Sequence, residues 1–156
     1  FGKSLFLDTL KCIFEGKKEL FEGLYIDDKW NWNQQYPVIK ISFGVSNSIT
    51  ELIANIFSLI KQNQKKFDIT LHNTEDYALC FEELIQVIHQ KHQKQVVILI
   101  DEYDLDSEKI LTELKSTLID MKGHLYYQEV NDALENYEYD EAMALLKTLE
   151  EVDTHD

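Results

Sequence analysis

The first residues of this sequence that could do chemistry are Gly2-Lys3-Ser4. They match the end of the pattern G-x-x-x-x-G-K-[ST]. In that pattern backbone N–H groups surround phosphates, the lysine neutralises the terminal phosphates and the hydroxyl binds Mg²⁺. A helix is predicted immediately afterwards, and a helix N-terminus favours a bound phosphate. The alternative is that these residues only begin and cap an ordinary helix.

A second candidate set follows the apolar run VVILI at 96–100, where Asp101 and Glu102 come next. An acidic pair at the carboxyl end of a buried strand is typical of a Walker B element. There Asp101 would hold Mg²⁺, directly or through water, and Glu102 would orient or deprotonate the attacking water. The alternative is a solvated loop without a chemical role. The presence of both motifs in this order favours the nucleotide-binding interpretation.

The elements that must position these residues alternate between helix and strand patterns. We predict, in order, a helix over 4–15, a strand over 38–43, a helix over 49–60, another helix after a loop near 67–73, and a strand over 96–100. Gly16 would end the first helix, and Ser48 and Thr74 would cap the next two. The inner face of the last helix would carry Phe81, Leu84, Ile85 and Ile88.

This order predicts an α/β fold, a partial P-loop type of parallel sheet with helices, because parallel neighbours need crossover connections of this length. The continuous apolar run at 96–100 is typical of a strand buried on both faces. Beyond Asp104 the pattern becomes helical only. We therefore predict one domain over 1–104 and an acidic, α-helical C-terminal appendage over 105–156.

The charge is unevenly distributed. The net charge of the sequence is −14. Residues 1–104 contain 11 Lys and 15 acidic residues, and residues 105–156 contain 4 Lys and 14 acidic residues. Such a surface repels phosphate backbones, so we expect no direct nucleic-acid binding by this segment. The sequence has no arginine, although many nucleotide hydrolases use one to stabilise transition-state charge.

The spacing of the cysteines and the hydropathy indicate the cellular compartment. Cys12 and Cys80 stand far apart without a C-x-x-C spacing, which favours a reducing environment over a disulfide framework. No stretch approaches the roughly 20 apolar residues that span a bilayer, and no leader opens the sequence. The expectation is a cytoplasmic protein without a membrane segment.

Three stretches, FGKSLFLDTLKCIFEGKKELFEGLYI, YPVIKISFG and VVILIDEYD, resemble the predicted AAA-ATPase family of bacterial proteins. Members carry an R-P-R-R-F-G-K-S loop and a D-E-Y-D strand end, often with a PD-(D/E)XK nuclease-like domain far downstream. The resemblance covers residues 1–104 and implies ATP and Mg²⁺ as ligands. It also implies that Gly2, Lys3 and Ser4 contact phosphate, that Ser4 and Asp101 bind Mg²⁺, and that Glu102 is catalytic. Asp104 matches the pattern without a role that we can assign.

Relative to that family, the strand and the front half of the loop that would precede Phe1 are not in this sequence. We therefore expect a fragment of an ATP-binding AAA-type ATPase with impaired hydrolysis. The alternative is a non-enzymatic module whose acidic amphipathic helices bind a protein partner. Because the missing strand would leave an open sheet edge, we also expect self-association.

The remaining candidates are weaker. Residues 129–152 resemble the last helices of histidine-phosphotransfer modules, but His124 does not fit the H-x-x-K-G pattern of a phosphate acceptor. His89 and His92 could share a metal, although solvated side chains are the favoured interpretation. Trp30 and Trp32 could stack on a base, but a loop anchor is favoured.

Overall fold

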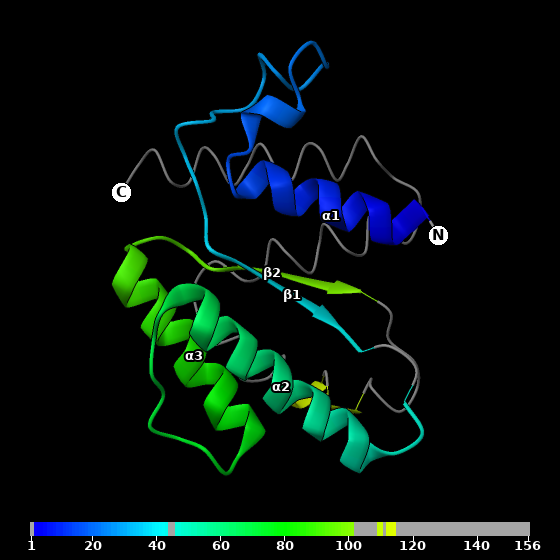
Figure 1. Ribbon diagram of the computed structural model, residues 1–156, viewed down its shortest axis with the longest axis vertical. Helices are drawn as coiled ribbons and strands as arrows, with labels where there is room; N and C mark the ends of the chain where they lie inside the picture. Colours follow the sequence, from blue (N-terminus) through cyan, green and yellow to red (C-terminus); the bar gives the residue numbers. More distant parts are fainter. Residues whose placement is uncertain (1, 44–45, 102–108, 111, 115–156) are drawn as a thin grey trace.

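The computed structural model describes residues 2–43, 46–101, 109–110 and 112–114. Its elements follow the predicted α/β order (Figure 1). They are α1 (Gly2–Phe14), a short 3-10 helix η1 (Lys18–Leu20), β1 (Val38–Ser42), α2 (Ile49–Phe67), α3 (Tyr77–His92) and β2 (Val97–Asp101). None of the helices in these ranges is long and apolar enough to cross a membrane.

The two strands form a parallel sheet in which Val38 lies opposite Val97 and Ser42 lies opposite Asp101. The connection between them runs through α2 and α3, which cover one face of the sheet, while α1 covers the other face (Figure 1). The predicted α/β fold with a parallel sheet is confirmed for this part of the chain.

Successive strand residues alternate between two hydrophobic clusters, as the period of a strand requires. The cluster toward α2 and α3 takes Ile39, Ile41, Ile98 and Ile100 from the sheet. The cluster toward α1 takes Val38 and Leu99. The sheet is therefore buried on both faces, which explains the nearly continuous apolar sequence of its strands.

Local signals fix the ends of the helices. Gly16 has a φ of +77°, and its N–H and that of Lys17 donate to the carbonyls of Ile13 and Cys12 at 3.0 Å each. This is the Schellman arrangement that glycine favours after a helix. The Ser48 hydroxyl accepts from the N–H of Glu51 at 3.2 Å, as predicted for α2.

The predicted cap of α3 was wrong. Asp76, rather than Thr74, precedes the helix, and its carboxylate accepts from the N–H groups of Ala78 and Leu79 at 2.9 and 3.0 Å. A carboxylate is a good N-cap because it satisfies free N–H groups and interacts favourably with the helix dipole. The inner face of α3 lies where it was predicted, since Phe81, Leu84, Ile85 and Ile88 are all buried.

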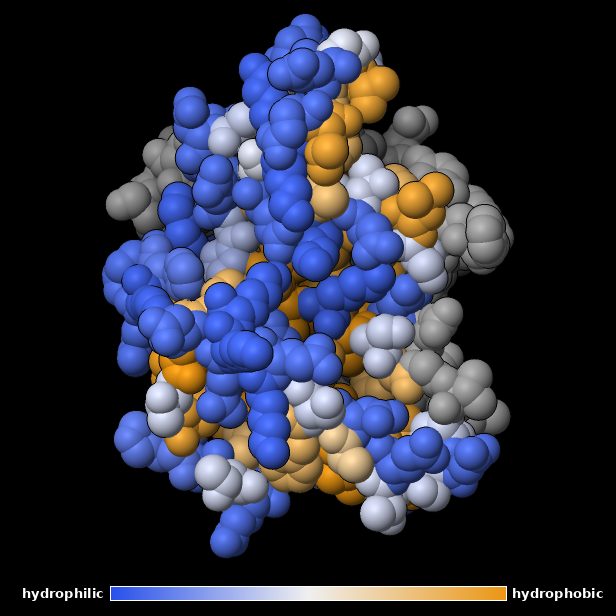
Figure 2. All heavy atoms as spheres, in the orientation of Figure 1, coloured by the Kyte–Doolittle hydropathy of each residue, from blue (hydrophilic) through white to orange (hydrophobic). Residues whose placement is uncertain are grey.

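The segment between α1 and β1 is anchored by its tryptophans. Trp30 is buried against α1, where its ring meets that of Phe14 edge-on at 5.7 Å. Trp32 stacks on Phe21 and donates its indole N–H to the carbonyl of Asp27 at 2.8 Å. These contacts agree with the loop-anchor interpretation. Hydrophobic side chains still reach the surface near the top of Figure 2, over this segment, where Leu20 and Leu24 are exposed.

The predicted C-terminal appendage falls mostly outside the described residues. Residues 109–110 and 112–114 are helical. Ile110 and Leu114 are buried in the cluster formed by α2, α3 and the sheet. These residues therefore add to the hydrophobic core on the side of the sheet that α2 and α3 cover.

Candidate nucleotide site

The two motifs singled out in the sequence come to the same side of the molecule. The Gly2 end of α1 lies on the side toward which the arrowheads of β1 and β2 point (Figure 1). In open α/β sheets this carboxyl edge of the strands is where ligands bind. The fold thus brings a helix N-terminus and the end of an apolar strand toward one another.

Asp101 is the last residue of β2 rather than the first residue after it. Its side chain is almost fully buried, with a relative exposure of 6%. A buried carboxylate needs a nearby positive charge or hydrogen bonds to remain ionised. The structure provides such a charge from the neighbouring strand.

That charge is Lys40, in the middle of β1 and opposite Leu99. Its ammonium group lies 3.7 Å from the Oδ2 of Asp101 and 2.7 Å from the Oδ1 of Asp8 on α1. The shorter distance is that of a charge-assisted hydrogen bond, whereas 3.7 Å is an ion-pair distance beyond hydrogen-bond range. Lys40 therefore links α1, β1 and β2, and it holds Asp8 more closely than Asp101.

Ser4, the other predicted Mg²⁺ ligand, lies on the same helix as Asp8. It is half-buried on α1, one helical turn before Asp8. Residues four apart share a helix face, with about 5–6 Å between their Cβ atoms. The Ser4 hydroxyl thus belongs to the face of α1 that meets the carboxyl edge of the sheet.

The other predicted site residues are described only in part. Gly2 and Lys3 form the start of α1, but their side-chain surroundings lie outside the description. Glu102 and Asp104 also fall outside the described residues. The first turn of α1 carries no acidic residue, so no side chain of that turn neutralises the positive end of the helix dipole.

The donors that are present fit Mg²⁺ bound to phosphate. Mg²⁺ prefers oxygen ligands and keeps several waters, so one or two protein oxygens together with phosphate oxygens suffice. The Asp101 carboxylate and the Ser4 hydroxyl are oxygen groups of this kind. In the described ranges no group of three or more His, Cys, Asp and Glu residues could hold a metal ion.

Sequence reasoning missed both Lys40 and Asp8. The available signal was a charge within a mainly apolar run, since Lys40 interrupts VIKIS and Asp8 interrupts SLFLDTL. Charged residues are rarely placed in buried elements unless they are paired. Asp8 also follows Ser4 by four positions, the spacing that places two side chains on one helix face.

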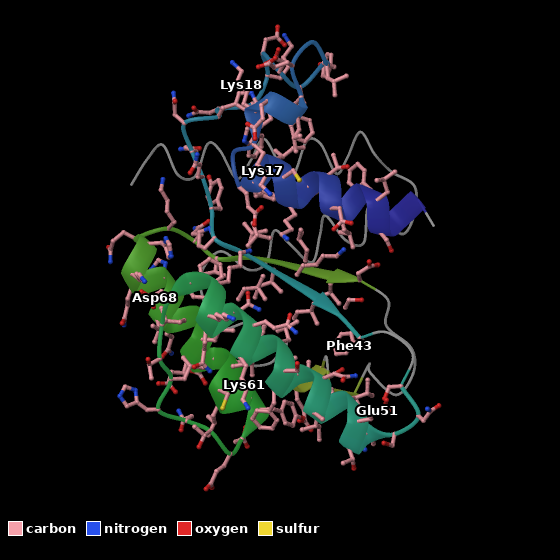
Figure 3. All side chains as sticks on the ribbon, viewed as in Figure 1. Lys17, Lys18, Phe43, Glu51, Lys61 and Asp68 are labelled. Atoms are coloured by element: carbon pink, nitrogen blue, oxygen red, sulfur yellow. The ribbon has the colours of Figure 1, made fainter. Side chains whose placement is uncertain are left out.

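The opposite edge of the sheet carries a second group of charges, near the labelled Lys17 (Figure 3). The Lys66 ammonium donates to Glu15 Oε1 at 3.0 Å and to the carbonyl of Val38 at 3.1 Å. Burial alone would raise the pKa of Glu15, but hydrogen bonds from Lys66 and Lys17 and the surrounding positive charge outweigh it and lower that pKa. This end of the sheet is held by short hydrogen bonds.

A shallow cavity of about 190 Å³ adjoins this second group, lined by Glu15, Tyr36 and Lys94 among others. His92, another lining residue, meets the ring of Phe67 edge-on, and His89 contacts the carbonyl of Lys94 at 2.7 Å. The two histidines therefore each have a separate partner. The cavity lies at the amino edge of the sheet, away from both sequence motifs.

Comparison with known proteins identifies the family of the chain. The family model described as predicted AAA-ATPase matches residues 1–146. The chain belongs to this AAA-ATPase-like family. The match continues well past residue 104, so it includes much of the segment that we separated as an appendage. The boundary at 104 stays a prediction.

One curated relative of this AAA-ATPase-like chain is an uncharacterized protein in the vnfD 5′ region of Azotobacter chroococcum mcd 1. The two are 42% identical over 106 residues, which is 67% of this chain and 20% of that protein. The chain thus spans about one fifth of its length. No solved structure matches.

Proposed function

We propose that the carboxyl edge of the sheet forms the part of an ATP site that holds the terminal phosphates and Mg²⁺. The observation that carries the proposal is the placement of α1, whose N-terminus starts with Gly2-Lys3-Ser4 and whose next turn contacts the buried strand end at Asp101 through Lys40. Membership of the AAA-ATPase-like family supports ATP as the nucleotide.

Each residue has a distinct role in this proposal. The N–H groups of the first turn of α1 and the Lys3 ammonium would bind phosphate oxygens. The Ser4 hydroxyl and the Asp101 carboxylate would orient Mg²⁺, which when bound neutralises charge on the phosphates. Glu102 would orient the attacking water and accept its proton.

We further propose that hydrolysis is impaired in a polypeptide of these 156 residues alone. The sequence supplies only the last three positions of the phosphate-binding pattern, so the backbone donors of the earlier positions would have to come from other residues. It also contains no arginine, so an arginine finger would have to come from another polypeptide. Nucleotide binding by these residues alone should accordingly be weak.

Titration with a fluorescent ATP analogue in the presence of Mg²⁺ tests the binding site. Lys3→Ala should weaken binding about tenfold or more, because a hydrogen bond from a charged group contributes about 1.5–3 kcal/mol. The matched control is Lys61→Ala, an exposed lysine on α2 that should leave binding unchanged (Figure 3). Equal binding by wild type and Lys3→Ala would contradict the proposal.

Phosphate release tests the impairment of hydrolysis. The wild-type polypeptide should turn over ATP near the background rate, and Glu102→Gln should change that rate little. A clear turnover that disappears in Glu102→Gln would contradict impaired hydrolysis while supporting the assigned role of Glu102.

The second candidate function is a non-enzymatic interaction module that binds a protein partner or self-associates. The net charge of residues 105–156, with 14 acidic residues against 4 Lys, favours it. Within the described ranges, each of the two strands is paired along one side only. The backbone groups along an unpaired side of a strand can pair with another molecule. Size exclusion with light scattering separates the possibilities: this candidate predicts a small oligomer, and a cooperatively unfolding monomer would contradict self-association.

A further inference from the structure

In the proposed site, Lys40 and Mg²⁺ would both lie beside the same carboxylate. Its ammonium lies beside the carboxylate of Asp101, the residue assigned to Mg²⁺. Like charges repel one another more strongly at short distance and in partly buried surroundings, and Mg²⁺ carries a double charge. Lys40 and Mg²⁺ therefore oppose one another at Asp101.

The geometry gives Lys40 another position to occupy. The contact with Asp101 is the long one, at 3.7 Å, and the contact with Asp8 is a hydrogen bond of 2.7 Å. The Asp8 side chain is 58% exposed, so it can keep the ammonium in partly hydrated surroundings. The flexible four-carbon stem of a lysine permits its ammonium to move away from Asp101 without loss of the hydrogen bond with Asp8.

We propose that Lys40 is an exchangeable counter-ion: it balances the buried Asp101 when no metal is bound, and when Mg²⁺ binds it moves away from Asp101 while it keeps its hydrogen bond with Asp8. This inference rests on the proposed Mg²⁺ site at Asp101. Asp8 is then a positioning residue, because it sets how readily Lys40 leaves Asp101. The pair regulates the affinity of the site for divalent cations without contacting the nucleotide.

Binding of Mn²⁺, followed by electron paramagnetic resonance on the full 156-residue chain, tests the exchange without relying on activity. Lys40→Met should bind Mn²⁺ about tenfold more tightly than wild type, a difference of about 1.4 kcal/mol, because the competing cation is removed. Asp8→Asn should bind more weakly, because Lys40 then has only Asp101 as an anionic partner. The matched control is Lys66→Met, which removes the other helix-to-sheet lysine and should leave Mn²⁺ affinity unchanged.

The outcomes separate this inference from the proposed function. If Asp101→Asn abolishes Mn²⁺ binding while Lys40→Met and Lys40→Gln both keep wild-type or weaker affinity, the Mg²⁺ site stands and the exchange is overturned. If Asp101→Asn binds as well as wild type, or if no variant binds, both are overturned. Lys40→Gln serves as the second variant should Lys40→Met fail to fold, since it keeps a polar end near Asp8.

Discussion

Two lysines connect a helix to the sheet in this molecule, one at each edge, and they do so differently. Lys66 at the amino edge makes two short contacts, 3.0 Å to Glu15 and 3.1 Å to the carbonyl of Val38. Lys40 at the carboxyl edge makes one short contact with an exposed carboxylate and one long contact with a buried carboxylate. Both contacts of Lys66 lie within hydrogen-bond range, whereas the contact of Lys40 with Asp101 is an ion pair beyond that range.

The difference indicates that the charges at the two edges have different roles. At the amino edge the charges hold α1, α2 and β1 together, and the neighbouring cavity carries no recognised motif. At the carboxyl edge the charges meet the start of α1 and the end of β2, where both motifs lie. We therefore expect substitutions at the amino edge to alter stability alone, and substitutions at the carboxyl edge to alter stability in a way that depends on the metal.

The largest expected effect is that of Lys66→Met. It removes the donor to a carboxylate and to a backbone carbonyl that are both partly buried, and it should lower the free energy of unfolding by about 2–3 kcal/mol. Urea denaturation measures this, and millimolar Mg²⁺ should not restore the loss. Lys61→Met, on an exposed position of α2, is the control with an expected change below about 0.5 kcal/mol. If Mg²⁺ restored the stability of Lys66→Met, the two edges would not differ in their response to the metal.

Lys40→Met should be destabilised by about 1–2 kcal/mol in metal-free buffer, because Asp101 loses its partner. Here the loss should be reduced by millimolar Mg²⁺, since a ligand that binds only the folded state stabilises it by mass action. The same urea experiment, run with Mg²⁺ and with EDTA, measures the difference. A loss that is identical in both buffers would mean that Lys40 is a structural lysine like Lys66.

Glu83 provides a reference for a carboxylate held without any lysine. The backbone N–H groups of His72 and Asn73 donate to it at 2.8 Å each and lower its pKa from 4.5 to about 2. A lowered folded-state pKa stabilises the protein above pH 4.5, and this stability is lost as the pH falls toward 2. Thermal unfolding across this range should show a shallower pH dependence in Glu83→Gln; an unchanged slope would contradict the assignment.

The smallest expected effect is the acid sensitivity of the amino edge. The pKa of Glu15 is also lowered from 4.5, with burial opposing the hydrogen bonds and charge of Lys66. Its contribution should be present above pH 4.5 and should decline below that value, within the window in which Glu83 titrates. In a Glu83→Gln background, Glu15→Gln should remove a further part of the slope. If Glu15→Gln caused no further change in the slope, the pKa of Glu15 would not be lowered in the folded protein.

Much of this fold could be predicted because its signals are local. The spacing of apolar residues in 49–60 and the pairing of Ser48 with the N–H of Glu51 depend only on neighbours in the sequence. The cap of α3 was misplaced because Thr74 and Asp76 are both good caps, and only the path of the preceding loop decides between them. The contact of Lys40 with Asp8 and Asp101 joins residues 32 and 61 positions away, so no local pattern could reveal it.

Hydrogen exchange of the backbone amides tests whether ATP binds at the carboxyl edge of the sheet. With Mg²⁺ and ATP in excess, we predict slower exchange in the first turn of α1 and at the end of β2, and no change around Glu15 and Lys94. The same nucleotide with EDTA should protect β2 less, because the role proposed for Asp101 depends on the metal. Protection confined to the cavity at the amino edge, or no protection anywhere at saturating nucleotide, would contradict the account.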